Sequence, residues 1–350
     1  MDNFEEYLIQ GEPDKSEKAK VWKTAIGLQQ VDGLTPSDYL IETARQNIEG
    51  NITIEEVKRR IDSYYQQHPL KNDEDRTEEA DKVSVRIAEI LGEKTFTFSP
   101  VEYLTIHRRL FHGIYKHAGK IRDYNITKHE WVLNGETVLY ASAESLKATL
   151  EYDFEQEKKF SYKGLGQQET VEHIARFISY LWQIHIFGEG NTRATAIFLI
   201  KYLRTFGFKV NNELFEKHSW YFRNALVRAN YKNHTKSIHA TNKFLLRFLG
   251  NLLFGESHIL KNREMHIYYV ASERSIEKGQ NVPVNVPVND TEKTVLELIK
   301  SNTGITYDDI AAIIKRNRKT VQRAINKLKQ LGLIERIGSD KTGHWKIIEQ

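Results

Sequence analysis

The ten residues from Ile184 to Arg193 (IHIFGEGNTR) constrain this chain more than any other stretch, because they lie between two segments with the pattern of buried helices. Apolar residues recur at helical spacing from Val171 to Trp182, and the segment 194–206 (ATAIFLIKYLRTF) is apolar on nearly every face. Between them lie a histidine, a carboxylate, two glycines, an asparagine and an arginine. A helical core does not require those residue types. A phosphate-binding site does.

The backbone of this loop is suited to binding an anion. Gly188 and Gly190 are expected to permit positive φ and to let backbone N–H groups converge. The second helix is predicted to begin near Asn191, so its unpaired N–H groups and the positive end of its dipole face the loop. Arg193 falls in the first helical turn, where a cation opposes the dipole unless an anion lies beside it.

Two further side chains supply chemistry. Glu189 offers one hard oxygen ligand, enough to help hold Mg²⁺ whose other ligands are phosphate oxygens and water. His185 can act as a general base on an incoming hydroxyl, since an imidazole titrates near neutral pH. The loop lacks the Gly-Lys-Ser/Thr of a P-loop and the His-Glu-x-x-His of a zinc protease, so neither of those classes is supported.

The pattern His-x-Phe-x-Glu-Gly-Asn-x-Arg resembles the signature of the Fic (filamentation induced by cAMP) family, whose typical members transfer AMP from ATP to a protein hydroxyl. The resemblance spans roughly residues 95–255. It implies that His185 is the catalytic base, that Glu189 is the Mg²⁺ ligand, and that a helix near 220–231 lines the adenine and ribose pocket. The implied nucleotide-binding residues are Gly188, Glu189, Gly190, Asn191, Thr192, Arg193, Tyr221 and Asn230.

This sequence departs from the family pattern at three positions. Ile186 replaces the usual proline, and Thr192 replaces the usual glycine or lysine. Ala196 stands where many members carry a second arginine for the γ-phosphate. The reaction implied by the resemblance is AMP transfer to a Ser, Thr or Tyr hydroxyl of a target protein or of the chain itself. Two alternatives stay open: transfer of another phosphoryl or nucleotidyl group, and a DNA-binding regulator whose Fic core is degenerate or senses a ligand.

The first 92 residues have a highly charged helical pattern that includes Ile48-Glu49-Gly50. This tripeptide resembles the inhibitory motif that many Fic proteins carry before the core, which would make Glu49 an inhibitory, antitoxin-like glutamate. Arg45 occupies the position of the motif's Ser or Thr. The alternative is that Gly50 simply caps the end of a surface helix.

Residues 130–141 (EWVLNGETVLYA) carry the clearest β pattern, with Asn134-Gly135 predicted as a two-residue hairpin turn. Fic proteins place such a flap over the active site and pair its edge with the target segment. That edge would lie at Val138, Leu139 and Tyr140. The alternative is a surface hairpin without a function.

The C-terminal residues follow a linker at 275–290 that contains two Val-Pro steps. Three predicted helices and a β-hairpin resemble a winged helix-turn-helix, whose third helix contacts DNA. The candidate DNA-binding residues are Arg316, Arg318, Lys319, Gln322 and Arg323. The competing interpretation is a protein-interaction or dimerisation module of the same fold.

Together these patterns predict a mainly α protein: an N-terminal helical segment (1–92), a Fic-type helical bundle with a β-hairpin flap (93–274), the linker, and a winged helix domain (291–350). Cysteine is absent, which excludes disulfides and thiol chemistry, and no apolar run reaches the length of a membrane span. We expect a cytoplasmic enzyme that uses ATP and Mg²⁺ and has a protein substrate and DNA as partners. Assembly into a homo-oligomer stays open.

Overall fold

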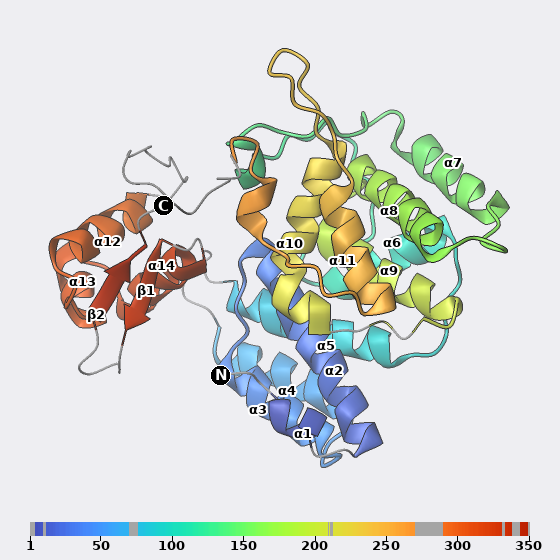
Figure 1. The fold of residues 1–350 in the computed structure, drawn as a ribbon. Helices are drawn as coiled ribbons and strands as arrows, with labels where there is room; N and C mark the ends of the chain where they lie inside the picture. The colour runs from blue at the N-terminus through green and yellow to red at the C-terminus, as the bar shows by residue number, and fades with distance from the viewer. Residues whose placement is uncertain are drawn as a thin grey trace. The chain divides into compact units, whose positions relative to one another are not determined.

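The computed structural model describes residues 4–9, 12–69, 76–208, 210, 213–269, 290–330, 333–337 and 344–348. The chain divides into two compact units, Met1–Ala271 and Ser272–Gln350, and each is described by itself (Figure 1). The predicted linker at 275–290 lies outside the described residues except for its last position.

The larger unit is helical. Its elements are α1 (Glu5–Ile9), α2 (Pro13–Gly27), η1 (Leu28–Asp32), α3 (Asp38–Ile48), α4 (Ile54–Gln67), α5 (Thr77–Gly92), α6 (Pro100–Phe111), η2 (Trp131–Leu133), α7 (Leu146–Lys159), α8 (Gln167–Ile184), α9 (Asn191–Thr205), α10 (Glu213–Asn230), α11 (Lys243–Phe254) and η3 (Asn262–Met265), where η denotes a 3₁₀ helix. The mainly α class is thereby confirmed. Ser37, Thr53 and Ser99 each accept a hydrogen bond from the first turn of the following helix, which explains where α3, α4 and α6 begin.

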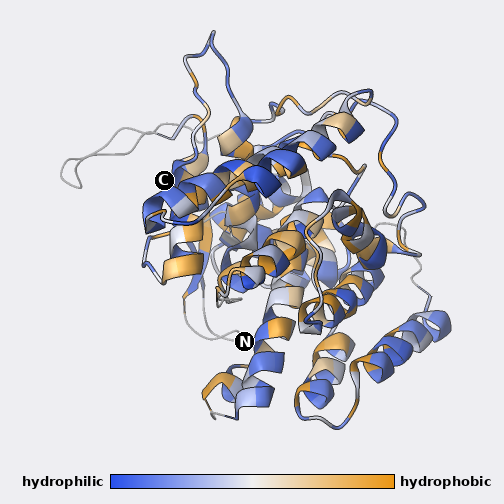
Figure 2. Ribbon diagram, turned by 90° about the vertical axis from the view of Figure 1, so that its right-hand side faces the viewer, coloured by the Kyte–Doolittle hydropathy of each residue, from blue (hydrophilic) through white to orange (hydrophobic). Residues whose placement is uncertain are grey.

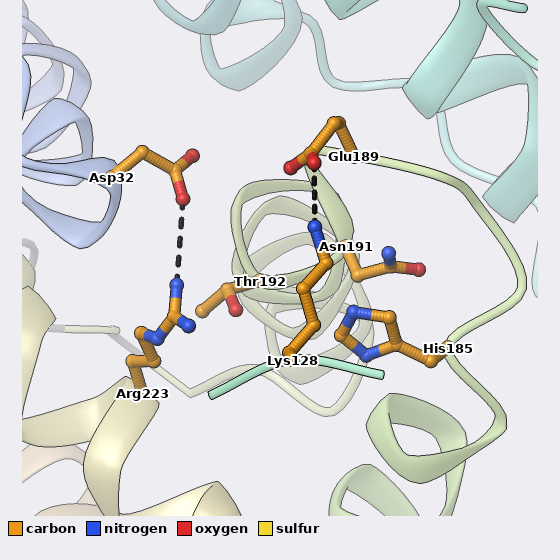
Figure 3. Close-up of a pocket in the computed structure, with 8 residues that line it drawn as sticks. Asp32, Lys128, His185, Glu189, Asn191, Thr192 and Arg223 are labelled. Atoms are coloured by element: carbon orange, nitrogen blue, oxygen red, sulfur yellow. Dashed lines mark hydrogen bonds and ion pairs between the residues drawn. The ribbon is translucent and has the colours of Figure 1, made fainter. Parts of the chain in front are cut away.

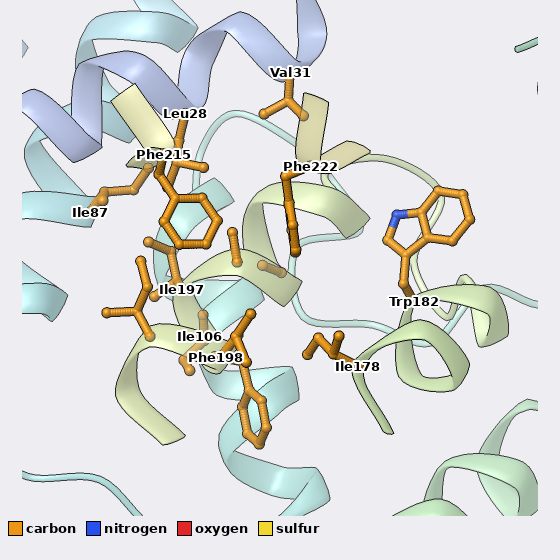
Figure 4. Packing of buried hydrophobic residues seen from close by; sticks show 14 of the residues in the cluster. Leu28, Val31, Ile87, Ile106, Ile178, Trp182, Ile197, Phe198, Phe215 and Phe222 are labelled. Atoms are coloured by element: carbon orange, nitrogen blue, oxygen red, sulfur yellow. The ribbon is translucent and has the colours of Figure 1, made fainter. Parts of the chain in front are cut away.

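One hydrophobic core joins the N-terminal helices to the rest of this unit. Leu28 and Val31 from η1 and Ile87 from α5 belong to the same cluster as Phe222 from α10 and Trp182 from α8 (Figure 4). The helix α9 lies at its centre, because every residue from Asn191 to Leu203 is buried. The helices described between residues 4 and 92 are therefore packed into the body that carries the 184–193 loop.

The approach of α2 to α10 requires a glycine. A Cβ at Gly27 would lie 2.2 Å from the Cα of Glu216, closer than real contacts allow. Ser219 on α10 also donates a hydrogen bond to the Gly27 carbonyl, at 2.8 Å. This contact fixes η1, which follows α2 directly, against α10.

The segment 130–141 differs from the prediction. The described residues there form no strand, and the reversal is built around η2, with Glu130 N–H donating to the Glu136 carbonyl at 3.0 Å. Asn134 and Gly135 do adopt positive φ, 53° and 84°. The two-residue hairpin was wrong because Trp131, Val132 and Leu133 coil into a 3₁₀ turn, in which Val132 and Leu133 are buried.

The smaller unit contains α12 (Asp290–Ser301), α13 (Tyr307–Ile314), α14 (Arg318–Gln330), β1 (Ile334–Ile337) and β2 (His344–Ile347). The strands pair antiparallel, with Ile334 opposite Ile347. Its own core includes Val295, Ile310, Ile325 and Trp345, and the Trp345 indole donates to the Ile305 carbonyl at 3.0 Å. Three helices followed by a hairpin confirm the winged helix prediction.

Hydrophobic and hydrophilic residues are interspersed along the helices of both units (Figure 2). Within the described ranges, none of the helices combines the length and the apolar character needed to cross a membrane.

Candidate active site

A small cavity of about 280 Å³ lies at the N-terminus of α9. Its lining comes from four parts of the larger unit: η1, the segment before η2, the 185–192 loop and α10. The lining residues are Asp32, Lys128, His185, Glu189, Gly190, Asn191, Thr192 and Arg223 (Figure 3). The structure thus brings together five of the residues predicted from the loop and adds three from distant segments.

The two loop glycines differ in backbone conformation and in their surroundings. Gly190 has φ 74° and is the N-cap of α9, and a Cβ there would lie 2.4 Å from the Phe111 ring. Gly188 does not have positive φ, contrary to the expectation; instead, a Cβ there would lie 2.5 Å from the Tyr124 hydroxyl. That hydroxyl is the far end of an exposed side chain, so this contact does not by itself require glycine at 188.

The loop is held by hydrogen bonds from its own asparagine. The Asn191 Oδ1 accepts from the Phe187 N–H at 3.0 Å, and its Nδ2 donates to the Phe187 carbonyl at 2.8 Å. Asn191 lines the cavity, but both polar atoms of its side chain are engaged with the backbone. Its observed role is to close the loop.

A buried histidine supports the same loop from α6. His107 stacks on Phe187 with ring centroids 3.6 Å apart. Its Nε2 lies 2.9 Å from the Glu189 carbonyl, and its Nδ1 accepts from the Gly119 N–H at 2.9 Å. A carbonyl only accepts, so Nε2 carries the proton and the ring is neutral. Burial lowers the pKa of His107 to about 3, so this support persists at neutral pH.

His185 ends α8 in the left-handed conformation, with φ 50° and ψ 52°. Arg122 stabilises this turn, since its Nε donates to the His185 carbonyl at 2.7 Å and its Nη2 donates to the Ala141 carbonyl at 2.5 Å. The Tyr140 ring lies 4.2 Å from the imidazole. Burial, reinforced by the positive charges of Lys128, Arg223 and Arg122, lowers the pKa of His185 well below its ordinary value.

The Glu189 carboxylate is paired with a lysine. Lys128 Nζ donates to its Oε1 at 2.5 Å (Figure 3). The donor set suits a hard cation only in part, because Glu189 provides a single carboxylate and the described residues contain no cluster of three metal-ligating side chains. A Mg²⁺ ion would therefore fit here only with phosphate oxygens and water as its other ligands.

The Thr192 side chain makes a hydrogen bond that a glycine at this position could not make. Its Oγ1 accepts a hydrogen bond from the Trp182 indole at 3.0 Å, which ties α8 to α9 behind the cavity.

Arg193 does not face the cavity. Its side chain is fully buried, its Nε lies 2.8 Å from Asp32 Oδ2, and its Nη2 lies 2.6 Å from Glu79 Oε1. Gln29 accepts from its Nη1 at 2.9 Å. Arg193 in the first turn of α9 does have anions beside it, but they are protein carboxylates from η1 and α5.

Glu49 lies outside the cavity lining. It is exposed after α3, accepts from the Tyr7 hydroxyl at 2.6 Å and from Asn51 at 3.2 Å, and is not among the residues that line the cavity. Gly50 has φ 83°, which agrees with the helix-end interpretation. The N-terminal carboxylate at the site is Asp32. Its only signal in the sequence is the Asp32-Gly33 pair, which is typical of a turn.

Tyr221 and Asn230 also lie outside the cavity lining. Tyr221 is buried and stacks on Phe248, with ring centroids 6.4 Å apart. Asn230 Nδ2 donates to Ser179 Oγ at 2.9 Å and to the Leu226 carbonyl at 2.9 Å. Both side chains therefore pack the α8–α10–α11 region in this structure.

The predicted flap residues alternate between buried and exposed. Val138 is buried, Leu139 is 82% exposed, and Tyr140 is buried against His185. The Leu139 carbonyl accepts from Gln183 Nε2 at 3.0 Å, which fastens the segment to the end of α8.

In the smaller unit, all five predicted DNA-binding side chains are exposed: Arg316, Arg318, Lys319, Gln322 and Arg323. Buried Val321, Ile325 and Leu328 occupy the other face of α14. Arg318 is paired with Asp308 at 2.8 Å.

Comparisons with known proteins add a family assignment. The model of the Fic/DOC family matches residues 97–203. This region is a Fic/DOC family domain. It contains the whole 184–193 loop. The model of the MarR family matches residues 286–343, so the smaller unit is a MarR-type winged helix domain.

Similar solved structures include a Fic family protein from Desulfovibrio desulfuricans G20, 14% identical, with a TM-score of 0.46 over 98% of this chain and 91% of that chain. A second is the BepC protein, a VirB-translocated effector from Bartonella tribocorum with bound AMPPNP. It is 20% identical, with a TM-score of 0.41 over 53% of this chain and 90% of that chain. No curated protein is significantly similar in sequence.

Proposed function

We propose that the Fic/DOC domain transfers AMP from ATP to a Ser, Thr or Tyr hydroxyl of a protein. The observation that carries this proposal is the environment of His185. Its imidazole lines a cavity at the N-terminus of α9, its Nδ1 is buried without a hydrogen-bond partner among the described residues, and its lowered pKa keeps the ring neutral near pH 7. A bound polyphosphate would offset the neighbouring positive charges that lower this pKa and so make the ring a stronger base. The helix dipole and the cations of Lys128 and Arg223 favour an anionic substrate at the same place.

In this proposal each residue has one task. His185 takes the proton from the attacking hydroxyl. The N-terminus of α9, from Gly190 to Thr192, stabilises charge that develops on the transferred phosphate. Glu189 would hold Mg²⁺, which supplies Lewis-acid charge neutralisation when bound. Asn191, His107 and Arg122 act as positioning residues, because they fix the loop rather than contact the reacting atoms.

We further propose that Asp32, rather than Glu49, restrains the site. Its carboxylate lies in the cavity between the guanidiniums of Arg193 and Arg223, at 2.8 Å and 3.5 Å. A carboxylate in that position repels phosphate and occupies its donors.

The reaction is tested by intact-mass spectrometry after the purified protein is incubated with Mg²⁺ and ATP, for wild type and Asp32→Ala. A mass gain of one AMP, larger in the variant, is expected. A gain of one phosphate would instead support the alternative group transfer. If neither protein nor any added target changes mass, the transferase proposal is refuted.

For the MarR-type domain we propose duplex DNA binding through the exposed basic side chains at the start of α14. The exposure of Lys319, Gln322 and Arg323 opposite the packed face supports this proposal. If the full chain bound no duplex even at low salt, the competing interaction-module interpretation would be favoured.

A further inference from the structure

Arg223 on α10 has the geometry of an unassigned anion ligand. It lines the cavity across from His185, with 19% of its side chain exposed (Figure 3). Glu130 anchors one end of the guanidinium, since Nη2 donates to Glu130 Oε1 at 3.0 Å and to Oε2 at 2.9 Å. Glu130 is itself buried, so this end is fixed.

The other end of the same guanidinium is weakly engaged. Nη1 has only long contacts, 3.4 Å to the Val31 carbonyl and 3.5 Å to Asp32 Oδ1. Nε has no hydrogen-bond partner among the described residues, although it is buried. A guanidinium presents five N–H donors, so donors of Arg223 remain for an oxyanion in the cavity.

The neighbouring helix, α9, does not supply this cation. Ala196 on α9 is buried and supplies no charge. Arg193 is already shared between Asp32, Glu79 and Gln29. Of the two cations that line the cavity, Lys128 is held by the Glu189 carboxylate, whereas Arg223 has a buried Nε without a hydrogen-bond partner among the described residues.

We propose that Arg223 binds the terminal phosphates of the nucleotide and that Asp32 occupies this subsite when the nucleotide is absent. The assignment rests on the proposed function, because it assumes that a nucleoside triphosphate enters the cavity. When Asp32 moves away, Arg193 keeps Glu79, whereas Arg223 keeps Glu130 and turns its free donors to the polyphosphate. Glu130, which directly precedes η2, thereby couples polyphosphate binding to the flap segment.

A binding measurement tests this without requiring turnover. We would measure the dissociation constants of ATP and AMP by calorimetry in the Asp32→Ala background. Because Arg223→Gln alone leaves a buried carboxylate unpaired, the comparison is between Glu130→Gln and the pair Glu130→Gln with Arg223→Gln. Thermal unfolding confirms that each variant is folded.

Adding Arg223→Gln is expected to weaken ATP binding about tenfold or more and AMP binding less than about threefold, because AMP lacks the terminal phosphates. Arg223→Lys should restore part of the ATP affinity. Equal losses for ATP and AMP, or no loss for either, would overturn the assignment and leave Arg223 as a structural link to Glu130.

The same data separate this inference from the proposed function. If ATP binding depends on Arg223 as expected but no AMP is transferred to any protein, the transferase proposal fails and the phosphate subsite stands. If Asp32→Ala binds neither ATP nor AMP, the transferase proposal and the phosphate subsite are both overturned.

Discussion

Replacing Arg193 with methionine should destabilise the larger unit strongly, because this residue joins η1 and α5 to α9. The guanidinium is fully buried and contacts Asp32 at 2.8 Å and Glu79 at 2.6 Å. Breaking a buried ion pair from one side costs about 3–5 kcal/mol. Glu79 keeps its contact with Arg76 at 2.7 Å. We therefore expect the free energy of unfolding to fall by about 3 kcal/mol, the lower limit of this range, which corresponds to roughly 6–12 °C in Tm.

The assay is urea denaturation of the full chain followed by tryptophan fluorescence. Four of the five tryptophans lie in the larger unit, at 22, 131, 182 and 220, so the signal reports mainly on that unit. Arg59→Met is the matched control, since Arg59 forms an exposed pair with Glu56 and its loss should cost less than about 1 kcal/mol. An Arg193→Met variant within about 1 kcal/mol of wild type would refute the structural role.

The same network predicts a pH dependence. Burial acts to raise the pKa of Glu79, but hydrogen bonds and charge from Arg76, Arg193 and Tyr115 outweigh it and hold the pKa below the usual value. The resulting stability is complete above the unfolded pKa of about 4.3 and is lost as the pH falls through the lower folded value. The cost of Arg193→Met should therefore be smaller at about pH 3 than at pH 7.

Three further predictions follow from the site and the smaller unit. Asp32→Ala should raise the rate of AMP transfer severalfold while Glu49→Ala leaves it unchanged, measured by labelling with ATP; the reverse order would restore Glu49 as the inhibitory residue. Asn191→Ala leaves two buried backbone groups unpaired, so it should cost about 2–4 kcal/mol in urea denaturation and abolish transfer; a stable, active variant would contradict its loop-closing role. Lys319→Gln should reduce the salt dependence of DNA binding by about one unit of slope, and an unchanged slope would remove Lys319 from the DNA interface.

The sequence specified the local features of this protein well. Helical periodicity located α8 and α9, and the change of residue types between them identified the loop that lines the cavity. Ser37 and Ser99 cap the helices that follow them through hydrogen bonds within three residues, so helix starts of this kind depend on local sequence alone. The unfavourable place of Arg193 in the helix suggested a neighbouring phosphate, whereas the anions beside it in the structure are the carboxylates of Asp32 and Glu79.

The sequence did not reveal which groups would meet across long separations. Arg193 contacts Glu79 from 114 residues away, and Lys128 reaches Glu189 from 61 residues away. The loop motif identified Arg193 and Glu189, but no local pattern distinguishes their partners, Glu79 and Lys128, from the other charged residues of the chain. For the same reason Glu49 drew attention through its motif, while the carboxylate at the cavity proved to be Asp32.

The central claim is that His185 acts as the base in nucleotide transfer. The most direct test compares Asp32→Ala with the Asp32→Ala, His185→Ala double variant, using intact mass for transfer and calorimetry for ATP binding. We predict that the double variant binds ATP within about threefold of its parent and adds no AMP to itself or to a target. Undiminished transfer without the imidazole would contradict the account, as would a loss of ATP binding that parallels the loss of transfer.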